Sequence, residues 1–105
     1  MKMGIIKNNF HDSNIKNITI SENILQIRID IDTHWSPGKK HGLLRLTNPQ
    51  YDERFIEYWE NDTDGWVESI KCERLGDRFL IKIVFHSRPE KIWDIIIDKY
   101  GFSRR

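Results

Sequence analysis

Apolar and polar residues alternate along the first third of the chain, with the period of a β-strand that buries one face. Over residues 25–31, one set of alternate positions is entirely apolar: Leu25, Ile27, Ile29 and Ile31. A shorter alternation over residues 18–21 precedes this run, and the polar residues Ser21, Glu22 and Asn23 separate the two. Two such runs joined by a short polar break predict a β-hairpin.

The same alternation predicts further strands downstream. Leu44 and Leu46 indicate a third strand, after a loop at Thr33–Gly42 that contains Pro37-Gly38. Residues 66–74 form a weaker candidate and residues 75–77 a turn. In the run 79–85 the second set of positions is partly apolar as well, which predicts a central strand covered on both faces.

Two segments fit either a helix or a strand. Within 49–60, Asn48-Pro49 suits a helix start and the aromatic residues fall at helical spacing, yet alternation is also present. Within 88–100, a capping box over 87–90 favours a helix, whereas the β-branched run 95–97 disfavours one. These residues predict an all-β or β-rich α+β fold. The pattern gives about six to seven antiparallel strands, with room for one short helix in 49–60 or 88–100.

Composition indicates a folded protein. The 105 residues fit a single domain, 1–105, and 38% hydrophobic residues with 31% charged ones are typical of globular rather than disordered chains. Cys72 is the single cysteine, so no intrachain disulfide and no oxidising compartment are indicated. Because no long apolar run exists, we expect no membrane partner and a cytoplasmic location.

Charge is unevenly distributed. The chain carries +1, but residues 51–68 contain seven acids and one base, a local charge of −6, together with five of the twelve aromatic residues. Protein interfaces are enriched in Tyr and Trp, and surrounding acids would attract a basic partner. The predicted partner-binding residues are Glu57, Tyr58, Trp59, Glu60, Asp62, Asp64 and Trp66. The alternative is a surface hairpin around a turn at 61–65, with its Trp rings in the core.

Other candidate chemistry is sparse. His11-Asp12 could form a base and its orienting carboxylate, but adjacent residues of an extended chain point to opposite sides and a third partner is not identifiable. We therefore expect a structural role, in which Asp12 or Ser13 caps a turn and His11 bonds to the backbone. Cys72 shares a strand face with Ile70, which indicates a buried, inert thiol.

Metal and nucleic-acid binding find little support. His34, His41 and His86 match no zinc spacing. The loop at 38–42 is basic and follows Trp35, and with the basic tail 104–105 it could contact nucleic acid, but a net charge of +1 is far from a basic footprint. We expect no catalytic residue, no metal ligand and no cofactor, and a protein that is not an enzyme.

The run Phe10-His11-Asp12-Ser13, followed by Ile15 and the alternation at 18–20, resembles the opening of a group of small bacterial proteins. These begin with an aromatic residue or Leu, then His-Asp-Ser or His-Asp-Ala, then a hairpin. The run 44–51 is similar to the strand and turn in their middle, and 79–85 with a final strand near 94–97 is similar to their end. Immunity proteins of polymorphic toxin and contact-dependent growth inhibition systems are found among them.

The resemblance implies an all-β meander, which favours strand in both ambiguous segments. It also implies an immunity-type protein that binds and neutralises a cognate toxin by blocking its active site, and the acidic charge of residues 51–68 predicts that this toxin is basic and nuclease-like. Because such families share no fixed contact motif, the resemblance assigns no interface residues. A small nucleic-acid-binding or enzymatic β-domain is the alternative.

Overall fold

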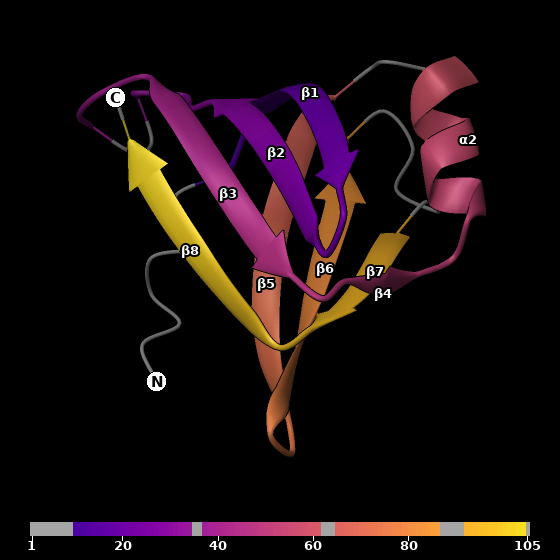
Figure 1. The fold of residues 1–105 in the computed structure, drawn as a ribbon. Coiled ribbons are helices and arrows are strands. Elements are labelled where there is room, and N and C mark those ends of the chain that lie inside the picture. The colour runs from indigo at the N-terminus through magenta and orange to yellow at the C-terminus, as the bar shows by residue number, and fades with distance from the viewer. Residues whose placement is uncertain (1–9, 35–36, 62–64, 87–91, 105) are drawn as a thin grey trace.

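Two four-stranded antiparallel sheets pack face to face in the computed structural model (Figure 1). The structure describes residues 10–34, 37–61, 65–86 and 92–104, without the side chains at positions 58, 60 and 61. One sheet has the order β1-β2-β3-β8 and the other β4-β7-β6-β5. The strands are β1 (Asn14–Ser21), β2 (Ile24–Asp30), β3 (His41–Thr47), β4 (Gln50–Tyr51), β5 (Val67–Leu75), β6 (Arg78–Phe85), β7 (Ile92–Ile97) and β8 (Lys99–Arg104). The β-rich antiparallel prediction is confirmed, but the single meander of six to seven strands is wrong, because eight strands divide between two sheets.

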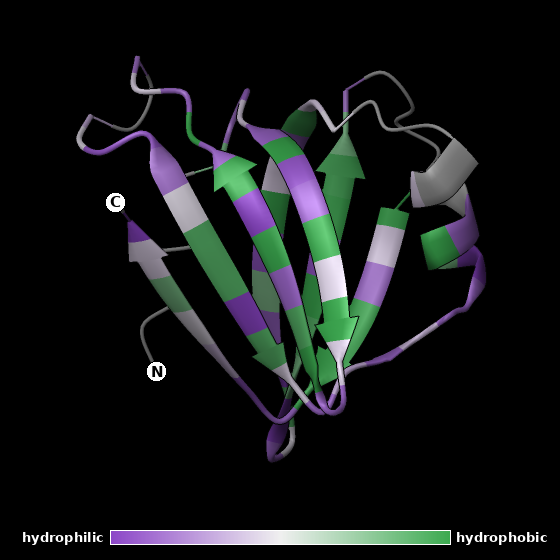
Figure 2. Ribbon diagram, turned by 45° about the horizontal axis from the view of Figure 1, so that its top comes forward, coloured by the Kyte–Doolittle hydropathy of each residue, from purple (hydrophilic) through white to green (hydrophobic). Residues whose placement is uncertain are grey.

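The predicted hairpin is present as β1 and β2. Ser21 pairs with Ile24, so Glu22 and Asn23 form the turn, and Glu22 adopts a positive φ of 53°. The alternate positions of β2 are fully buried, and Figure 2 shows the matching alternation of hydropathy along this sheet. The alternation of apolar and polar residues therefore predicted both the position of β2 and the face that it buries.

The core lies between the inner faces of the two sheets. Its buried members come from every layer: Phe10, Ile15, Leu25, Ile27, Ile29, Ile31, Leu44, Leu46, Phe55, Val67, Ile70, Ile81, Ile83, Phe85, Trp93, Ile95 and Ile97. Each fully buried aliphatic side chain contributes about 1.5–3 kcal/mol relative to exposure. Strand β6 is central, as predicted, although the residues on its second face are half-buried.

The segment 49–60 divides between two structures. It begins as β4 and continues as helix α2 (Arg54–Asn61), so the strand that we favoured there is wrong from Arg54 onward. Asp52 starts the helix by accepting a hydrogen bond from the backbone N–H of Arg54 at 3.0 Å, and hydrogen bonds from Arg54 lower the pKa of Asp52. Phe55 and Trp59, one helical turn apart, then pack against Trp93.

The segment 88–100 contains strands β7 and β8, as favoured, although positions 88–91 lie outside the described residues. The β-branched run that disfavoured a helix supplies the buried face of β7. Among the described residues, no helix is long and apolar enough to cross a membrane.

A polar corner joins the two sheets where β7 passes into β8. Arg78 donates to Asp98 Oδ1 at 2.8 Å and to the carbonyl of Asn48 at 3.0 Å, while Asn48 Nδ2 donates to Asp98 Oδ2 at 2.6 Å. The Asn48 amide, with help from Arg78, lowers the pKa of Asp98. Asn48 has a positive φ of 52°, which lets the chain leave β3 and cross to the other sheet. The Asn-Pro pair therefore marks a sheet-to-sheet crossing rather than a helix start.

We expect Ile29→Asp to unfold the domain, because it places an unpaired charge in a fully buried position of β2. The matched control is Thr19→Asp on β1, which introduces the same side chain at an exposed position. Thermal unfolding should show a cooperative transition for Thr19→Asp close to that of the parent, and none for Ile29→Asp. Similar melting temperatures for the two variants would contradict the register described here.

Candidate functional site

The segment Phe10–Ser13 connects the two sheets. The backbone N–H of Asp12 donates to the carbonyl of Val67 at 2.9 Å, and the N–H of Val67 donates to the carbonyl of Ser13 at 2.8 Å. The buried hydroxyl of Ser13 accepts from the N–H of Asp32 at 3.1 Å, at the end of β2. The predicted contact of His11 with the backbone is present, since its Nδ1 lies 3.0 Å from the carbonyl oxygen of Glu68, whereas the Ser13 hydroxyl contacts a distant segment instead of capping its own turn.

Gly65 and Trp66 complete the junction from the other side. The N–H of Ile15 donates to the carbonyl of Gly65 at 2.9 Å, and Trp66 forms a β-bridge with Asn14. A Cβ atom added at Gly65 would overlap the backbone oxygen of Ile15. The close approach of the two chains therefore requires glycine at this position.

Three ionisable side chains meet at this junction: His11, Asp12 and His86. His86 Nε2 lies 2.7 Å from Asp12 Oδ1, and His11 Nε2 lies 3.5 Å from Asp12 Oδ2. The side chains of His11, Asp12 and His86 are 43%, 25% and 24% exposed, so the cluster lies at the surface without being fully solvated. We call these three residues the His-Asp-His cluster.

This cluster corrects two predictions. His11 and Asp12 do not point to opposite sides, because Asp12 has a left-handed backbone with φ of 61° and the chain turns rather than extends there. A third partner also exists, since the backbone N–H of His86 donates to the carbonyl of Trp66 at 3.0 Å and so holds His86 beside the motif. No local signal in the sequence could reveal His86, because β-pairing between distant segments brings it to Asp12.

The two tryptophans of the acidic segment have different environments. Trp59, on α2, is half-buried, and its ring meets that of Trp93 edge-on with centroids 6.2 Å apart. Trp66 is 46% exposed, and its ring packs on that of His86 with centroids 4.4 Å apart. Trp59 therefore packs toward the core, as the alternative to an interface role expected, whereas Trp66 lies at the surface, as an interface residue would.

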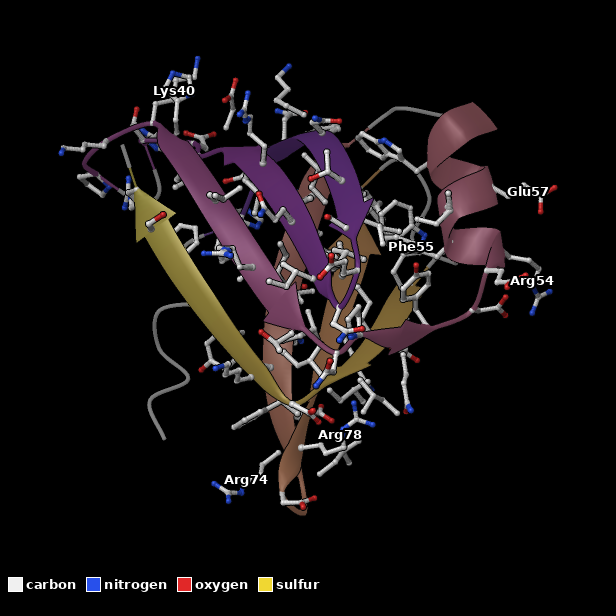
Figure 3. All side chains as sticks on the ribbon, viewed as in Figure 1. Lys40, Arg54, Phe55, Glu57, Arg74 and Arg78 are labelled. Carbon is white, nitrogen blue, oxygen red and sulfur yellow. The ribbon has the colours of Figure 1, made fainter. Side chains whose placement is uncertain are left out.

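The remaining predicted interface residues are partly described. Glu57 is exposed on α2 and points away from the body of the protein, opposite to Phe55 (Figure 3). The side chains of Tyr58 and Glu60, and residues Asp62 and Asp64, lie outside what the structure describes. A turn was expected at 61–65, but its first residue, Asn61, is the last residue of helix α2.

Other reactive side chains lie apart from the cluster. His41 hydrogen-bonds Asp30 at 3.0 Å at the start of β3. Cys72 is half-buried rather than buried as predicted, and its burial raises the pKa of the thiol, with a smaller opposing effect of a hydrogen bond with Tyr100. Four residues of extended strand, about 13 Å, separate Cys72 from Glu68, the neighbour of His11.

The loop and tail that were candidates for nucleic-acid contact lie together. Arg104 Nε donates to the carbonyl of Lys39 at 2.8 Å, and Lys39 and Lys40 are exposed. Trp35 and Arg105 lie outside the described residues. The described part of this surface is basic, and Lys40 lines a hollow whose wall also includes Asp12 of the His-Asp-His cluster.

Comparison with known proteins shows the fold. No protein-family model and no curated protein match the chain. A solved structure titled as an uncharacterized protein from Neisseria gonorrhoeae is similar, with a TM-score of 0.59 and 21% identity over 94% of this chain and 97% of that one. At that identity the likeness concerns the architecture, which is therefore shared across nearly the whole length of both chains.

We expect Gly65→Ala to destabilise the domain by about 1–3 kcal/mol, because the added methyl group forces Ile15 and Gly65 apart. Gly101→Ala is the matched control, since a Cβ there meets nothing within 4 Å. Urea unfolding followed by tryptophan fluorescence gives both values. Equal stability of the two variants would show that Ile15 and Gly65 can move apart without cost to the fold.

Proposed function

We propose that this chain is an immunity-type protein, which binds a basic, nuclease-like toxin and neutralises it by covering the toxin's active site. The observation that carries the proposal is Trp66, a half-exposed aromatic ring in the most acidic stretch of the chain. The resemblance of Phe10–Ser13 and the middle strand to a group of small bacterial proteins that includes immunity proteins supports it independently. The proposed mechanism is stoichiometric binding, which requires no catalytic residue.

Trp66 has the properties of a preorganised anchor. Its backbone is held in the bridge to Asn14, and its ring is supported on one side by His86. A ring that is already ordered loses little conformational entropy when a partner covers it. Tryptophan is among the residues most enriched in the few contacts that dominate binding energy.

Further exposed residues at this end of the second sheet suit a protein partner. Ile92, at the start of β7, is 52% exposed and pairs with Val84, two residues before His86. Exposed acids accompany these apolar side chains, with Glu68 next to Trp66 on β5 and Asp94 on β7. Apolar anchors surrounded by charge are the usual composition of a protein interface.

The charge explains why the proposed partner is basic. A nuclease binds a polyanion, so the cleft that holds its substrate is itself positive. An acidic surface is attracted to that cleft, and it accelerates association while opposing acidic partners. The −6 charge of residues 51–68 lies in the segment that includes Trp66 and Glu57.

We expect Trp66→Ala to weaken binding by about 2 kcal/mol or more, mainly through faster dissociation, because it removes the anchor. Leu75→Ala is the matched control, since Leu75 is 44% exposed at the other end of β5. The partner is isolated by pull-down from the native host, and rates are measured by surface binding kinetics after circular dichroism confirms folding. Equal dissociation rates for the two folded variants would show that Trp66 is not the anchor.

The acids should act on association instead. We expect the double variant Asp62→Asn with Asp64→Asn to slow association several-fold at low salt, with little effect at high salt, because salt screens the long-range attraction between oppositely charged partners. Glu73→Gln with Asp77→Asn removes the same charge from two exposed positions, Glu73 near the end of β5 and Asp77 in the turn after it, and should leave the rate unchanged. If both pairs behave alike, the surface of Lys39, Lys40 and Arg104 becomes the better interface and an acidic partner the better match.

A further inference from the structure

The His-Asp-His cluster combines ligand types that metal ions prefer. It offers two imidazole nitrogens and one carboxylate, and one such atom from each residue lies within 4.8 Å of the others. Two histidines and one carboxylate form a common set of protein ligands for a divalent transition metal, with water or substrate in the remaining positions. Among the described residues this is the one group of histidine, cysteine and acidic side chains that converges in this way.

His11 is oriented as metal-binding histidines are. Its Nδ1 lies 3.0 Å from the carbonyl oxygen of Glu68. A carbonyl can only accept a hydrogen bond, so Nδ1 carries the proton and Nε2 of the neutral ring presents its lone pair. That lone pair is on the side of the Asp12 carboxylate, 3.5 Å away. A backbone carbonyl in this position fixes the tautomer and the ring direction of a ligating histidine.

His86 approaches the same carboxylate differently from an ordinary His–Asp pair. Its Nε2 is buried and lies 2.7 Å from Asp12 Oδ1, yet the two groups lack the alignment of a hydrogen bond. At 2.7 Å the nitrogen and the carboxylate oxygen are in close contact whichever way the proton points. The pair His41–Asp30 provides the contrast, since its 3.0 Å contact is a hydrogen bond.

The backbone holds the three ligands in place. Asp12 is fixed by its left-handed turn and by the bond from its N–H to Val67, and His86 by the bond from its N–H to Trp66. The ring of Trp66 covers one side of the His86 ring. Ligands whose orientation is set by backbone bonds and packing lose little entropy when an ion binds.

We propose that His11, Asp12 and His86 form a binding site for a divalent transition-metal ion, with Zn²⁺ as the expected ion. Zinc bonds to nitrogen and oxygen are about 2.0–2.2 Å, which places tetrahedral ligand atoms about 3.4 Å apart. Small rotations of the partly exposed rings reach that spacing from the observed one. The fourth position faces solvent or a bound partner. This replaces the expectation of no metal ligand, and it does not depend on the proposed toxin binding.

The test is calorimetric titration of the untagged full chain with ZnCl₂. We expect one ion per chain, and an affinity at least about 10-fold lower for His86→Gln and for Asp12→Asn. Asn readily adopts the left-handed backbone of position 12, so Asp12→Asn preserves the turn while removing the charge. His41→Gln is the matched control, because it removes a histidine from the His41–Asp30 pair and should bind Zn²⁺ like the parent.

A second measurement separates a binding role from a structural one. Saturating Zn²⁺ should raise the melting temperature of the parent and of His41→Gln but not of His86→Gln, because a ligand that binds the folded state stabilises it. The proton NMR signals of the His11 and His86 rings should shift on titration, and those of His41 should not. Absence of saturable zinc binding, or equal affinity in all variants, would overturn the proposal, as would a preference for Mg²⁺ over Zn²⁺.

Discussion

The close approach of two chain segments, Asp12–Ile15 and Gly65–Val67, is the contact on which the rest of the molecule depends. Reciprocal backbone bonds between Asp12, Ser13 and Val67 fix the edge of one sheet against the edge of the other. The approach is possible because position 65 has no side chain. The Ile15 and Val67 side chains then enter the core from the same junction, so backbone pairing and apolar burial stabilise each other there. The same bonds bring His11, Asp12, Trp66 and His86 together, so both proposed sites depend on this contact.

Local patterns predicted the parts of the fold that local physics determines. The β1–β2 hairpin, the β5–β6 turn and the buried face of β2 followed from alternation, because neighbouring strands pair across a two-residue turn. The division into two sheets was not predictable in this way. The polar corner between the sheets is formed by Arg78, Asn48 and Asp98, which come from three separate segments and meet only after the strands have assembled. Helix α2 lies in one of the two segments for which a short helix was expected as an option, and the helical spacing of Phe55 and Trp59 was its signal, but the resemblance to a meander favoured strand there.

For the candidate sites, as for the fold, the sequence revealed the local segments but not the distant residues that they contact. Composition identified the acidic aromatic segment, but it could not distinguish Trp59, which packs on Trp93, from Trp66, which faces solvent. The motif His11-Asp12 was noticed as a pair, and its turn was expected. Its partner His86 could not be inferred, because the register that places His86 beside Trp66 is a property of the β5–β6 pairing. Spacing rules for metal ligands fail for the same reason when the ligands come from different sheet edges.

The strand order leaves β5 at the edge of its sheet, where, within the described part of the chain, β6 is the strand that pairs along it. Such an edge is a template on which a second chain can add a strand and begin an aggregate. The exposed side chains of β5 are almost all charged and of mixed sign: Glu68, Lys71, Glu73 and Arg74. An incoming strand would have to strip water from these charges, so the domain can remain dispersed at high concentration despite an open edge.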